Sequence, residues 1–496
     1  MWLGTDERMV KLVLAGTTWD VRFAVNLRPA RLMHRALGLA SESGLPAKCL
    51  FPTTSSLGTF LSLPSLSFYN QLVAANPEQR SAVQVIVSRL SGAAPYLVFG
   101  PPGTGKTVTL VEAIKQVLWV HPDTHVLATA PSNTAADHVA RQLAPDVPTT
   151  EVLRLHAASR NLEEVDAGVA EVSNLRDGEL YFPPLAELLE RRVVVATLAT
   201  AGRLVSACVP SNHFQFIFID EAGQATEPET LIALAGLAKL PSPGRLGAQV
   251  VMAGDPHQLG PVLASQQAAA GGLATSLLER LMDSPLYSRG AAGYEGRAIT
   301  KLLRNFRSHP ALLALPSKLF YNSELLPCAD SRLVSSLLHF SGLTERARGL
   351  VPFLFHGIVA RDYREATDTS YFNPSEAVVV VHYVTKLVGE GVRPADIGVI
   401  APYRKQVAKL RGRLAEAVWG EEVTVGTTEE FQGQERLAIV LSTVRSSPDL
   451  ASDANHRLGF LANPRRFNVA ITRAKALLIV VGNPAVLSQV GAAMSC

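Results

Sequence analysis

The sequence contains little cysteine. Only four cysteines occur among its 496 residues, and no two of them form a CxxC pair. This sparse, scattered distribution argues against a local zinc site and against a disulfide framework, and it favours a reducing intracellular compartment. The four positions are Cys49, Cys208, Cys328 and Cys496.

The sequence also lacks long apolar runs. The longest, such as "AVVVVHYV" and "ALLIVV", are much shorter than the roughly 20 residues that a membrane span needs. The first residues, "MWLGTDERMV", carry acidic side chains where a secretory signal would need an apolar core. We therefore expect a soluble, cytoplasmic protein that does not associate with membranes.

A strong excess of one charge is missing as well. The formal net charge is only +3, so a nucleic-acid partner is neither required nor excluded, because a local groove can bind phosphates on a nearly neutral protein. A hydrophobic content of 47% with 18% charged residues is typical of a globular protein. The length allows two to four domains.

Short apolar runs alternate with helical patterns from about residue 95 onward. Continuous apolar strands that are each followed by a helix predict parallel sheets covered on both faces. Ten strands are more than one compact sheet usually carries, so we divide them into two sets of five at the polar, Gly-rich stretch 283–297. This predicts two tandem α/β domains, 71–290 and 291–496. The runs are "YLVFG", "HVLATA", "VVVATL", "FIFID", "QVVMAGD", then "ITKLL", "IGVIAP", "VTVGT", "LAIVLSTV" and "LLIVVGN".

Residues 1–70 have a different pattern. "WDVRFAVN" alternates like a half-buried strand, and "RPARLMHRALGLAS" predicts a helix with Arg28, Arg31 and Arg35 near one side. Such a basic face is either solvated or contacts phosphates. The Ser- and Leu-rich segment 53–68 is typical of a linker. We expect a short N-terminal β/α region ahead of the two domains.

The strongest motif is "GPPGTGKT", residues 100–107. It follows a strand and opens a helical run, which is the context that a phosphate-binding P-loop requires. Glycines let backbone N–H groups wrap the phosphates, and the helix N-terminus adds a favourable dipole. Lys106 would neutralise the β- and γ-phosphates, and Thr107 would ligate Mg²⁺. The nucleotide-binding residues are therefore Gly100, Pro101, Pro102, Gly103, Thr104, Gly105, Lys106 and Thr107.

Two further strands end in polar residues. "FIFIDEAGQ" delivers Asp220, a candidate Mg²⁺ ligand, and Glu221, a candidate to orient or deprotonate the attacking water. A solvated turn or a helix cap is the alternative for that pair. "VVMAGDPHQLGPV" places Asp255 and Gln258 where a glutamine could sense the γ-phosphate; a plain turn with a surface glutamine is equally compatible with the pattern.

Eight motifs in this order resemble those of the superfamily 1 helicases of the up-frameshift-like group. Details such as "ITKLLRNFRSHP" and "RFNVAITRAKALLIVVGNP" are similar to the Moloney leukaemia virus ten (Armitage-type) RNA helicases, over residues 76–484. The resemblance implies two tandem RecA-like P-loop NTPase domains. The motifs are "GPPGTGKT", "APSNTAAD", "DEAGQ", "GDPHQLGP", "LRNFRSHP", "APYRKQ", "EEFQGQE" and "NVAITRAK".

The resemblance also implies roles for residues outside the P-loop. Gln79 would read the adenine, Phe306 would stack on it, and Glu435 would contact the ribose. Arg307 and Arg473 match the two arginines that reach the γ-phosphate from the second domain. Arginine suits this role because it supplies a fixed charged fork. If the two sides come from different domains, closing them completes the site. Structural ion pairs are the alternative for both arginines.

The candidate nucleic-acid contacts follow strands of both domains. Hydroxyl, amide and backbone N–H groups at strand ends suit phosphate contact, and together they predict a track along a single strand gripped by its backbone. Each residue could equally be a helix cap or a turn residue. The candidates are Ser132, Asn133, Thr134, Thr197, Thr200, Tyr403, Arg404, Thr427 and Thr428.

The expected function is ATP-dependent, Mg²⁺-dependent 5′-to-3′ translocation on single-stranded RNA by a monomer. Roles in RNA-mediated silencing, Argonaute partners and P-body localisation are implied by the resemblance alone. Since about 75 residues precede the first matched motif, we expect an N-terminally short version of the resembled proteins. A DNA helicase, an ATP-regulated RNA-binding clamp and a ring-forming ATPase are the alternatives; intact catalytic residues argue against the clamp, and arginines in the same chain argue against the ring.

Overall fold

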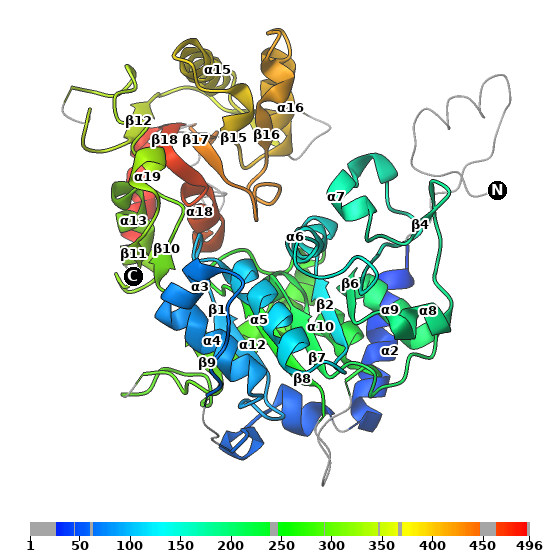
Figure 1. Cartoon of the computed structure of the whole chain (residues 1–496). Helices are drawn as coiled ribbons and strands as arrows, with labels where there is room; N and C mark the ends of the chain where they lie inside the picture. Colours follow the sequence, from blue (N-terminus) through cyan, green and yellow to red (C-terminus); the bar gives the residue numbers. More distant parts are fainter. Residues whose placement is uncertain are drawn as a thin grey trace, which may run out of the picture.

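The structure is a computed structural model, and two α/β units are its main feature (Figure 1). It describes residues 26–43, 45–59, 63–238, 247–291, 293–345, 348–365, 370–446 and 463–493.

The first unit is built on a seven-stranded sheet with the order β3-β6-β2-β7-β8-β1-β9. All of its strand pairs are parallel, so their carboxyl ends share one edge. The strands are β1 (Tyr96–Phe99), β2 (Val126–Ala130), β3 (Val152–Leu155), β6 (Val193–Thr197), β7 (Phe216–Ile219), β8 (Gln249–Gly254) and β9 (Ile299–Lys301).

Helices cover both faces of this sheet (Figure 1). Alternate residues of β1 show this directly, since Leu97 and Phe99 belong to one apolar core and Tyr96 and Val98 to another. The helices are α3 (Gln71–Ala75), α4 (Pro77–Val87), α5 (Lys106–Val120), α6 (Asn133–Leu143), α7 (Ala167–Ala170), α8 (Leu185–Glu190), α9 (Leu198–Ser206), α10 (Glu227–Leu234), α11 (Gln266–Ala268) and α12 (Leu277–Met282), with a small hairpin β4 (Leu175–Arg176) and β5 (Glu179–Leu180).

The second unit carries a five-stranded parallel sheet with the order β12-β18-β17-β15-β16. Its strands β12 (Phe353–Gly357), β15 (Ile397–Ile400), β16 (Thr424–Gly426), β17 (Arg436–Ser442) and β18 (Ala474–Gly482) are flanked by α15 (Pro374–Gly389), α16 (Arg404–Leu414), α18 (Pro464–Ile471) and α19 (Pro484–Ala493). Residues of β17 again alternate between two cores.

The connection between the sheets contains several short elements. These are β10 (Arg304–Asn305), β11 (Leu326–Pro327), α13 (Pro310–Phe320) and α14 (Ser331–Val334), while β13 (Tyr363–Arg364) and β14 (Tyr371–Phe372) form a hairpin before α15. Short 3-10 or π turns complete the fold at Pro46–Leu50, Thr54–Ser56, Leu162–Glu164, Ala222–Gln224, Ala269–Leu273, Pro394–Asp396 and Gly420–Glu422.

The expected fold class, two tandem RecA-like α/β domains, is confirmed, but the assignment of the run "ITKLL" is wrong. It forms β9, which pairs with β1 at the edge of the first sheet rather than opening the second set. The stretch 283–297 therefore lies within the first unit. Our pattern also omitted β3 and β12, which complete the two sheets. β12 was hard to recognise because it is an edge strand with alternate residues exposed.

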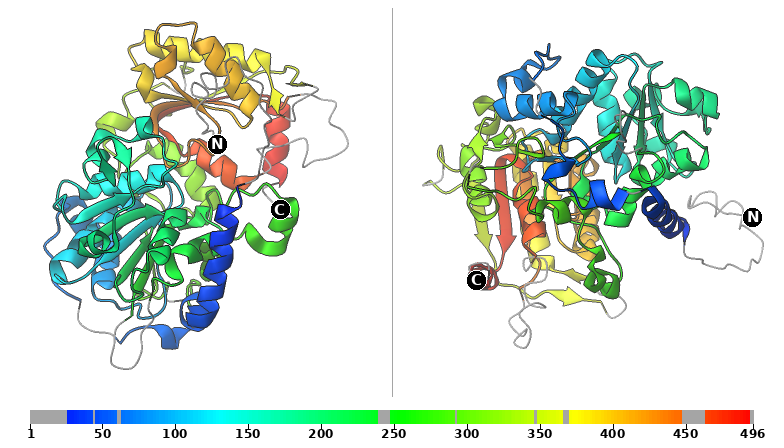
Figure 2. Two further views of the ribbon diagram at one scale, coloured as in Figure 1. Left: turned by 90° about the vertical axis from the view of Figure 1, so that its right-hand side faces the viewer. Right: turned by 90° about the horizontal axis from the view of Figure 1, so that it is seen from below.

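The N-terminal region packs on the first unit. The predicted helix is present as α2 (Arg28–Ser43), which packs against α9 and α10 and is the dark blue helix at the side of the first unit in Figure 2. Arg35 donates through its guanidinium to Ser206 Oγ at 2.8 Å and to the carbonyl oxygen of Gly202. It is therefore a packing residue rather than part of a phosphate-contacting face. The predicted strand at 19–26 lies almost wholly outside the described residues.

Within the described part of the chain, no helix has the length and apolar character needed to cross a bilayer.

A buried carboxylate supports an unusual backbone turn in the second unit. Glu376 is fully buried, and its Oε2 accepts hydrogen bonds from Ser442 Oγ at 2.7 Å and Val444 N at 2.8 Å. Val444 has a φ of 70°, which a β-branched residue rarely adopts. Burial raises the pKa of Glu376 to about 7, although these hydrogen bonds oppose the shift.

This raised pKa predicts a pH-dependent stability. Between the ordinary value of 4.5 and about 7, the folded state retains a proton that the unfolded state has released, so stability falls as pH rises through this range. Across this pH range, we expect the free energy of unfolding of the unmodified protein to fall by up to about 3 kcal/mol relative to that of the Glu376→Gln variant. Urea unfolding of both proteins at pH 4.5, 5.5, 6.5 and 7.5 measures this; a constant difference would contradict it.

Candidate active site and nucleic-acid interface

The P-loop follows β1 at the carboxyl edge of the first sheet. Gly103 and Gly105 have φ of 71° and 81°, a left-handed conformation that favours glycine. A Cβ on Gly100 would lie 2.0 Å from Lys106 Cγ, so glycine is required where the lysine folds back. Lys106 Nζ donates to the Gly100 carbonyl oxygen at 2.9 Å. The loop therefore has the backbone geometry of a phosphate cradle.

The acidic pair lies two strands away. β8 separates β1 from β7, and Asp220 and Glu221 follow β7 at the same edge of the sheet. Lys106 Nζ lies 3.9 Å from Glu221 Oε1. Burial, together with Glu221, raises the pKa of Asp220 to about 6. Asp220 is almost completely buried, so a solvated turn does not describe it.

The donors for Mg²⁺ are placed together. Thr107 Oγ1 donates to Asp220 Oδ2 at 2.6 Å, so a hydroxyl and a carboxylate converge beside the P-loop. These are hard oxygen ligands, and Mg²⁺ is usually held by one or two protein ligands together with substrate phosphates and water. Within the described residues, no group of three or more His, Cys, Asp or Glu side chains gathers into a metal site. The pair fits a magnesium ion bound jointly with a nucleotide.

The stretch 303–308 crosses directly over the P-loop. Phe306 N donates to the Gly103 carbonyl oxygen at 2.8 Å, and Asn305 Nδ2 donates to the Pro102 carbonyl oxygen at 2.7 Å. The Phe306 ring is 41% exposed and is therefore available for stacking. Residues that are about two hundred positions apart in the sequence thus form one site.

Arg307 is held by residues of the second unit. Its Nε forms an ion pair with Glu435 Oε2, and its Nη1 donates to the Thr472 carbonyl oxygen at 3.1 Å. Lys475 Nζ lies 2.8 Å from the other oxygen of Glu435. Burial alone would raise the pKa of Glu435, but Arg307 and Lys475 outweigh it and lower this pKa to about 2. In this conformation both Arg307 and Glu435 are already paired with each other.

Arg473 is buried in the turn between α18 and β18. Its guanidinium donates to four neutral oxygens, including Val469 O at 3.0 Å and Gln258 Oε1 at 3.3 Å. Burial and the neighbouring Arg307 lower the pKa of Arg473 to about 9, so it stays protonated at neutral pH. Among the described residues no carboxylate lies within ion-pair distance of it. The structural ion pair considered as an alternative therefore applies to Arg307 but not to Arg473.

Gln258 and Gln79 are both buried. Gln258 contacts Arg473 of the second unit, so a surface glutamine is ruled out as the alternative. Gln79 Nε2 donates to Thr109 Oγ1 at 2.9 Å and to the Gly105 carbonyl oxygen at 3.2 Å. This contact places Gln79 against the P-loop, and adenine recognition stays a prediction.

The same stretch contains residues whose roles the sequence pattern did not reveal. Arg304 forms an ion pair with Glu78 in α4, which fastens the strand end to the first unit. His309 caps α13, since its Nδ1 accepts a hydrogen bond from Ala311 N at 3.2 Å. Asn305 is the anchor to the P-loop, and its place inside the motif "LRNFRSHP" was the available signal.

The candidate nucleic-acid contacts of the first unit follow β2 and β6, which are neighbours in the sheet. Ser132 and Thr197 cap α6 and α9, where each accepts a backbone hydrogen bond at 3.2 Å. Asn133 Oδ1 accepts from Arg154 Nη2 at 3.1 Å. Ser132 and Thr134 are exposed, whereas Thr200 is buried. Exposed hydroxyls and a fixed amide thus line this part of the edge.

In the second unit the candidates follow β15 and β16, which are also neighbours. Arg404 is exposed, and Tyr403 is partly buried with its ring edge-on to Tyr371. Thr427 is buried, and the Thr428 hydroxyl is buried without a hydrogen-bond partner, so neither faces solvent in this conformation. These candidates lie at the carboxyl ends of strands, whereas Glu435 and Arg473 lie at amino ends.

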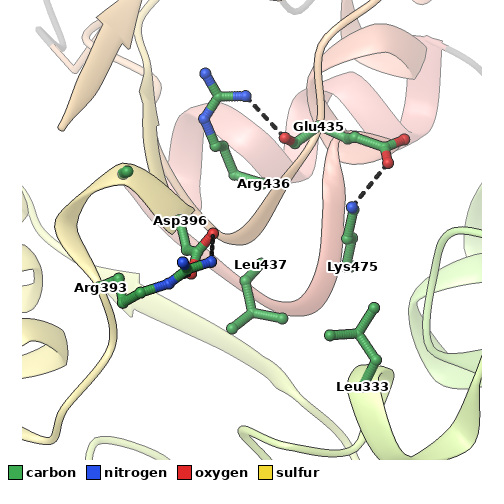
Figure 3. A pocket seen from close by; sticks show the side chains of 8 residues that line it. Leu333, Arg393, Asp396, Glu435, Arg436, Leu437 and Lys475 are labelled. Carbon is green, nitrogen blue, oxygen red and sulfur yellow. Dashed lines mark hydrogen bonds and ion pairs between the residues drawn. The ribbon is translucent and has the colours of Figure 1, made fainter. Parts of the chain in front are cut away.

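A cavity of about 280 Å³ adjoins Glu435 on the second unit (Figure 3). Its acidic side chains are both paired, Glu435 with Lys475 and Asp396 with Arg393. It belongs to the neighbourhood of the expected ribose contact. The lining residues are Leu333, Arg393, Ala395, Asp396, Glu435, Arg436, Leu437 and Lys475.

Comparisons with known proteins agree with this organisation. Two family models, each described as an AAA domain, match residues 74–279 and 273–485. Among solved structures, the helicase nonstructural protein 10 of an arterivirus covers 83% of this chain and 63% of its own, with a TM-score of 0.40 and 14% identity, too weak a similarity to support an argument.

Relatives in the curated proteins are much more similar. The helicase MOV-10 of Gallus gallus is 46% identical over 98% of this chain, and RNA helicase Mov10l1 of Mus musculus is 45% identical over 85%. The "Probable RNA helicase armi" of Drosophila melanogaster is 34% identical over 85%. The chain spans 52%, 35% and 38% of these relatives, about half or less of their length.

The fold and the split nucleotide site define a P-loop NTPase with two tandem RecA-like units. Within that class, the MOV-10, Mov10l1 and armitage proteins are close homologues of this chain.

The P-loop lysine and the acidic pair predict two inactivating substitutions. Lys106→Ala removes the cation expected to neutralise the β- and γ-phosphates, and Glu221→Gln removes the carboxylate expected to orient or deprotonate the attacking water. We expect either change to abolish ATP hydrolysis while binding of single-stranded nucleic acid is largely retained, because the candidate nucleic-acid contacts follow other strands, namely β2, β6, β15 and β16. Steady-state ATPase rates and fluorescence-anisotropy binding measure both; full turnover in either variant would refute the site.

Arg473 predicts a large effect on turnover. Arg473→Ala should lower kcat by on the order of 10³, the scale of an arginine finger. Arg332→Ala is the matched control, because this exposed arginine lies on α14 outside the site; it should leave kcat unchanged. A loss below tenfold in Arg473→Ala would mean that this arginine has only a structural role. Thermal unfolding of both variants separates lost chemistry from lost folding.

Proposed function

We propose that this protein is an ATP-dependent RNA helicase that hydrolyses ATP to move 5′ to 3′ along single-stranded RNA. The observation that carries the proposal is the seating of residues 303–308 on the P-loop through the Phe306–Gly103 hydrogen bond. Arg307 lies beside the P-loop, and Arg473 of the second unit contacts Gln258 of the first. These contacts support a nucleotide site that both units complete.

The side chains have separate tasks in this proposal. Lys106 neutralises the β- and γ-phosphates, and Glu221 orients or deprotonates the attacking water. Arg307 and Arg473 stabilise negative charge that develops in the transition state. Thr107 and Asp220 would hold Mg²⁺, which when bound offsets charge on the phosphates. Arg473 belongs to the second unit, and Arg307 lies in the connection between the sheets and is paired with Glu435 of the second unit. Closing the two units would therefore complete the site and couple hydrolysis to their relative motion.

The placement of the exposed polar groups supports binding of single-stranded nucleic acid through its phosphate backbone. Ser132 and Thr134 of the first unit and Arg404 of the second lie at carboxyl strand ends, which suits phosphate contact along one strand. RNA rather than DNA is supported by the relatives named RNA helicase Mov10l1 and "Probable RNA helicase armi".

We also propose, from the family resemblance, that the protein acts as a monomer in RNA-mediated silencing with Argonaute-type partners in the cytoplasm, in P-bodies or similar granules. Affinity purification of the tagged chain and fluorescence microscopy test this biological setting; a nuclear distribution without Argonaute partners would refute it.

An unwinding assay with four duplexes tests the biochemical function. RNA and DNA duplexes, each with either a 5′ or a 3′ single-stranded overhang, are incubated with ATP and Mg²⁺. We expect RNA-stimulated ATPase activity and unwinding only of RNA with a 5′ overhang. Unwinding of DNA alone would favour the DNA helicase, and tight RNA binding without turnover would favour the clamp. Lys106→Ala is the inactive control.

A further inference from the structure

A buried chain of hydrogen bonds joins the two units behind the nucleotide site. Asp255 Oδ2 accepts from Gln258 Nε2 and from Tyr321 Oη, each at 2.7 Å. Asn468 Nδ2 in α18 donates to Tyr321 Oη at 2.6 Å and to the His257 carbonyl oxygen at 2.8 Å.

The side chains in this series of hydrogen bonds are all buried, with exposed fractions from 0% to 5%; they are Asp255, Gln258, Tyr321 and Asn468, while His257 contributes only its backbone carbonyl oxygen. Together with the bond from Arg473 to Gln258, they close a ring between the β8 turn and α18.

The direction of each hydrogen bond is fixed by chemistry. An ionised carboxylate can only accept, so both Tyr321 and Gln258 must donate to Asp255. The Gln258 amide thereby turns its oxygen toward Arg473. Burial and the neighbouring Asp255 raise the pKa of Tyr321 well above its usual value, so its hydroxyl keeps its proton. The amide orientation of Gln258 thus depends on Asp255, and Asp255 is held by the tyrosine hydroxyl.

Tyr321 contacts both units. It follows α13, whose Leu313 belongs to the core of the first unit and whose Leu312 belongs to a core of the second. The Tyr321 ring lies in the first core, edge-on to His257 with centroids 5.6 Å apart, while its hydroxyl contacts Asn468 of the second unit. Because Tyr321 bonds to both Asn468 and Asp255, a movement of α18 would shift Asp255 through this one side chain.

We propose that Tyr321 is a positioning residue for ATP hydrolysis: its hydroxyl orients Gln258 through Asp255 and fixes that orientation to the second unit through Asn468. Its buried hydroxyl bonds to Asp255 and Asn468, so we expect its role to lie in turnover rather than in ATP binding. This inference rests on the proposed ATPase activity.

Tyr321→Phe tests the proposal by removing only the hydroxyl. We expect kcat for RNA-stimulated ATP hydrolysis to fall at least about tenfold, since small misplacement of a reacting group is costly, while KM for ATP changes less than about threefold. Tyr287→Phe is the matched control: this tyrosine is also fully buried in the first core, and its hydroxyl donates to the Pro95 carbonyl oxygen at 2.6 Å. It should lose comparable thermal stability but keep its kcat.

Double variants show whether Tyr321 acts through Gln258. If it does, adding Tyr321→Phe to Gln258→Ala should lower kcat by less than twofold further, because the residue through which it acts is already gone. Independent, multiplying effects would overturn the proposal. Asn468→Ala breaks the chain at its other end and should reproduce the loss of kcat with unchanged KM; this variant also covers the case in which Tyr321→Phe fails to fold.

The controls separate this inference from the proposed function. If the unmodified protein hydrolyses no ATP with RNA present, the proposed function fails and takes the inference with it. If the unmodified protein is active and Tyr321→Phe or Asn468→Ala retains its full kcat, or if Tyr287→Phe loses as much kcat as Tyr321→Phe, only the positioning role is refuted.

Discussion

The contact between the P-loop and the chain that crosses it is the constraint on which the nucleotide site depends. Phe306 N–H and the Asn305 amide bind carbonyl oxygens of the loop itself. The approach is so close that a Cβ at Gly103 would lie 2.6 Å from Arg307 Cβ. Two physical requirements therefore favour glycine at position 103. Its φ of 71° shapes the phosphate cradle, and the absence of a side chain allows residues 303–308 to pass close to the loop. This crossing point places Arg307 beside the P-loop although the two are about two hundred residues apart in sequence.

The two arginines at this site are held in physically different ways. Arg307 forms an ion pair with Glu435, so a nucleotide that binds either residue must first replace the other as its partner. Arg473 is buried among neutral oxygens, which costs stability because a desolvated cation lacks a compensating charge. If Arg473 acts on the phosphates as proposed, no ion-paired carboxylate has to be displaced first, and preorganised charges of this kind are most effective in a water-excluded site. Arg307 can therefore change its partner when a nucleotide binds, whereas Arg473 supplies a positive charge that is fixed in place.

Features of the fold and the site could be predicted from the sequence where they depend on residues that are close together in the chain. The P-loop and the acidic pair could be recognised because each is a short string with a fixed backbone requirement. β3 was missed because Arg154, buried against Asp137 at 2.7 Å, interrupts the apolar pattern of that strand. β9 was assigned to the wrong sheet because three residues carry no information about their partner strand. Tyr321 gave no signal at all, since its function depends on two groups that are distant in sequence. Long-range pairing, rather than composition, is what the sequence leaves open.

The environment of Gln258 shows why a neutral side chain suits the boundary between the units. Its amide lies between a buried anion, Asp255, and a buried cation, Arg473, with the N–H toward the first and the oxygen toward the second. A charged residue here would cancel one neighbour and leave the other buried and uncompensated, which is costly in a low-dielectric interior. The amide dipole favours both charges at once without neutralising either. Any displacement of Arg473 toward phosphate weakens one end of this arrangement, and the other end, held by Tyr321 through Asp255, then determines where the amide points. A movement of the second unit can therefore change the orientation of the Gln258 amide while the net charge at the phosphate site stays unchanged.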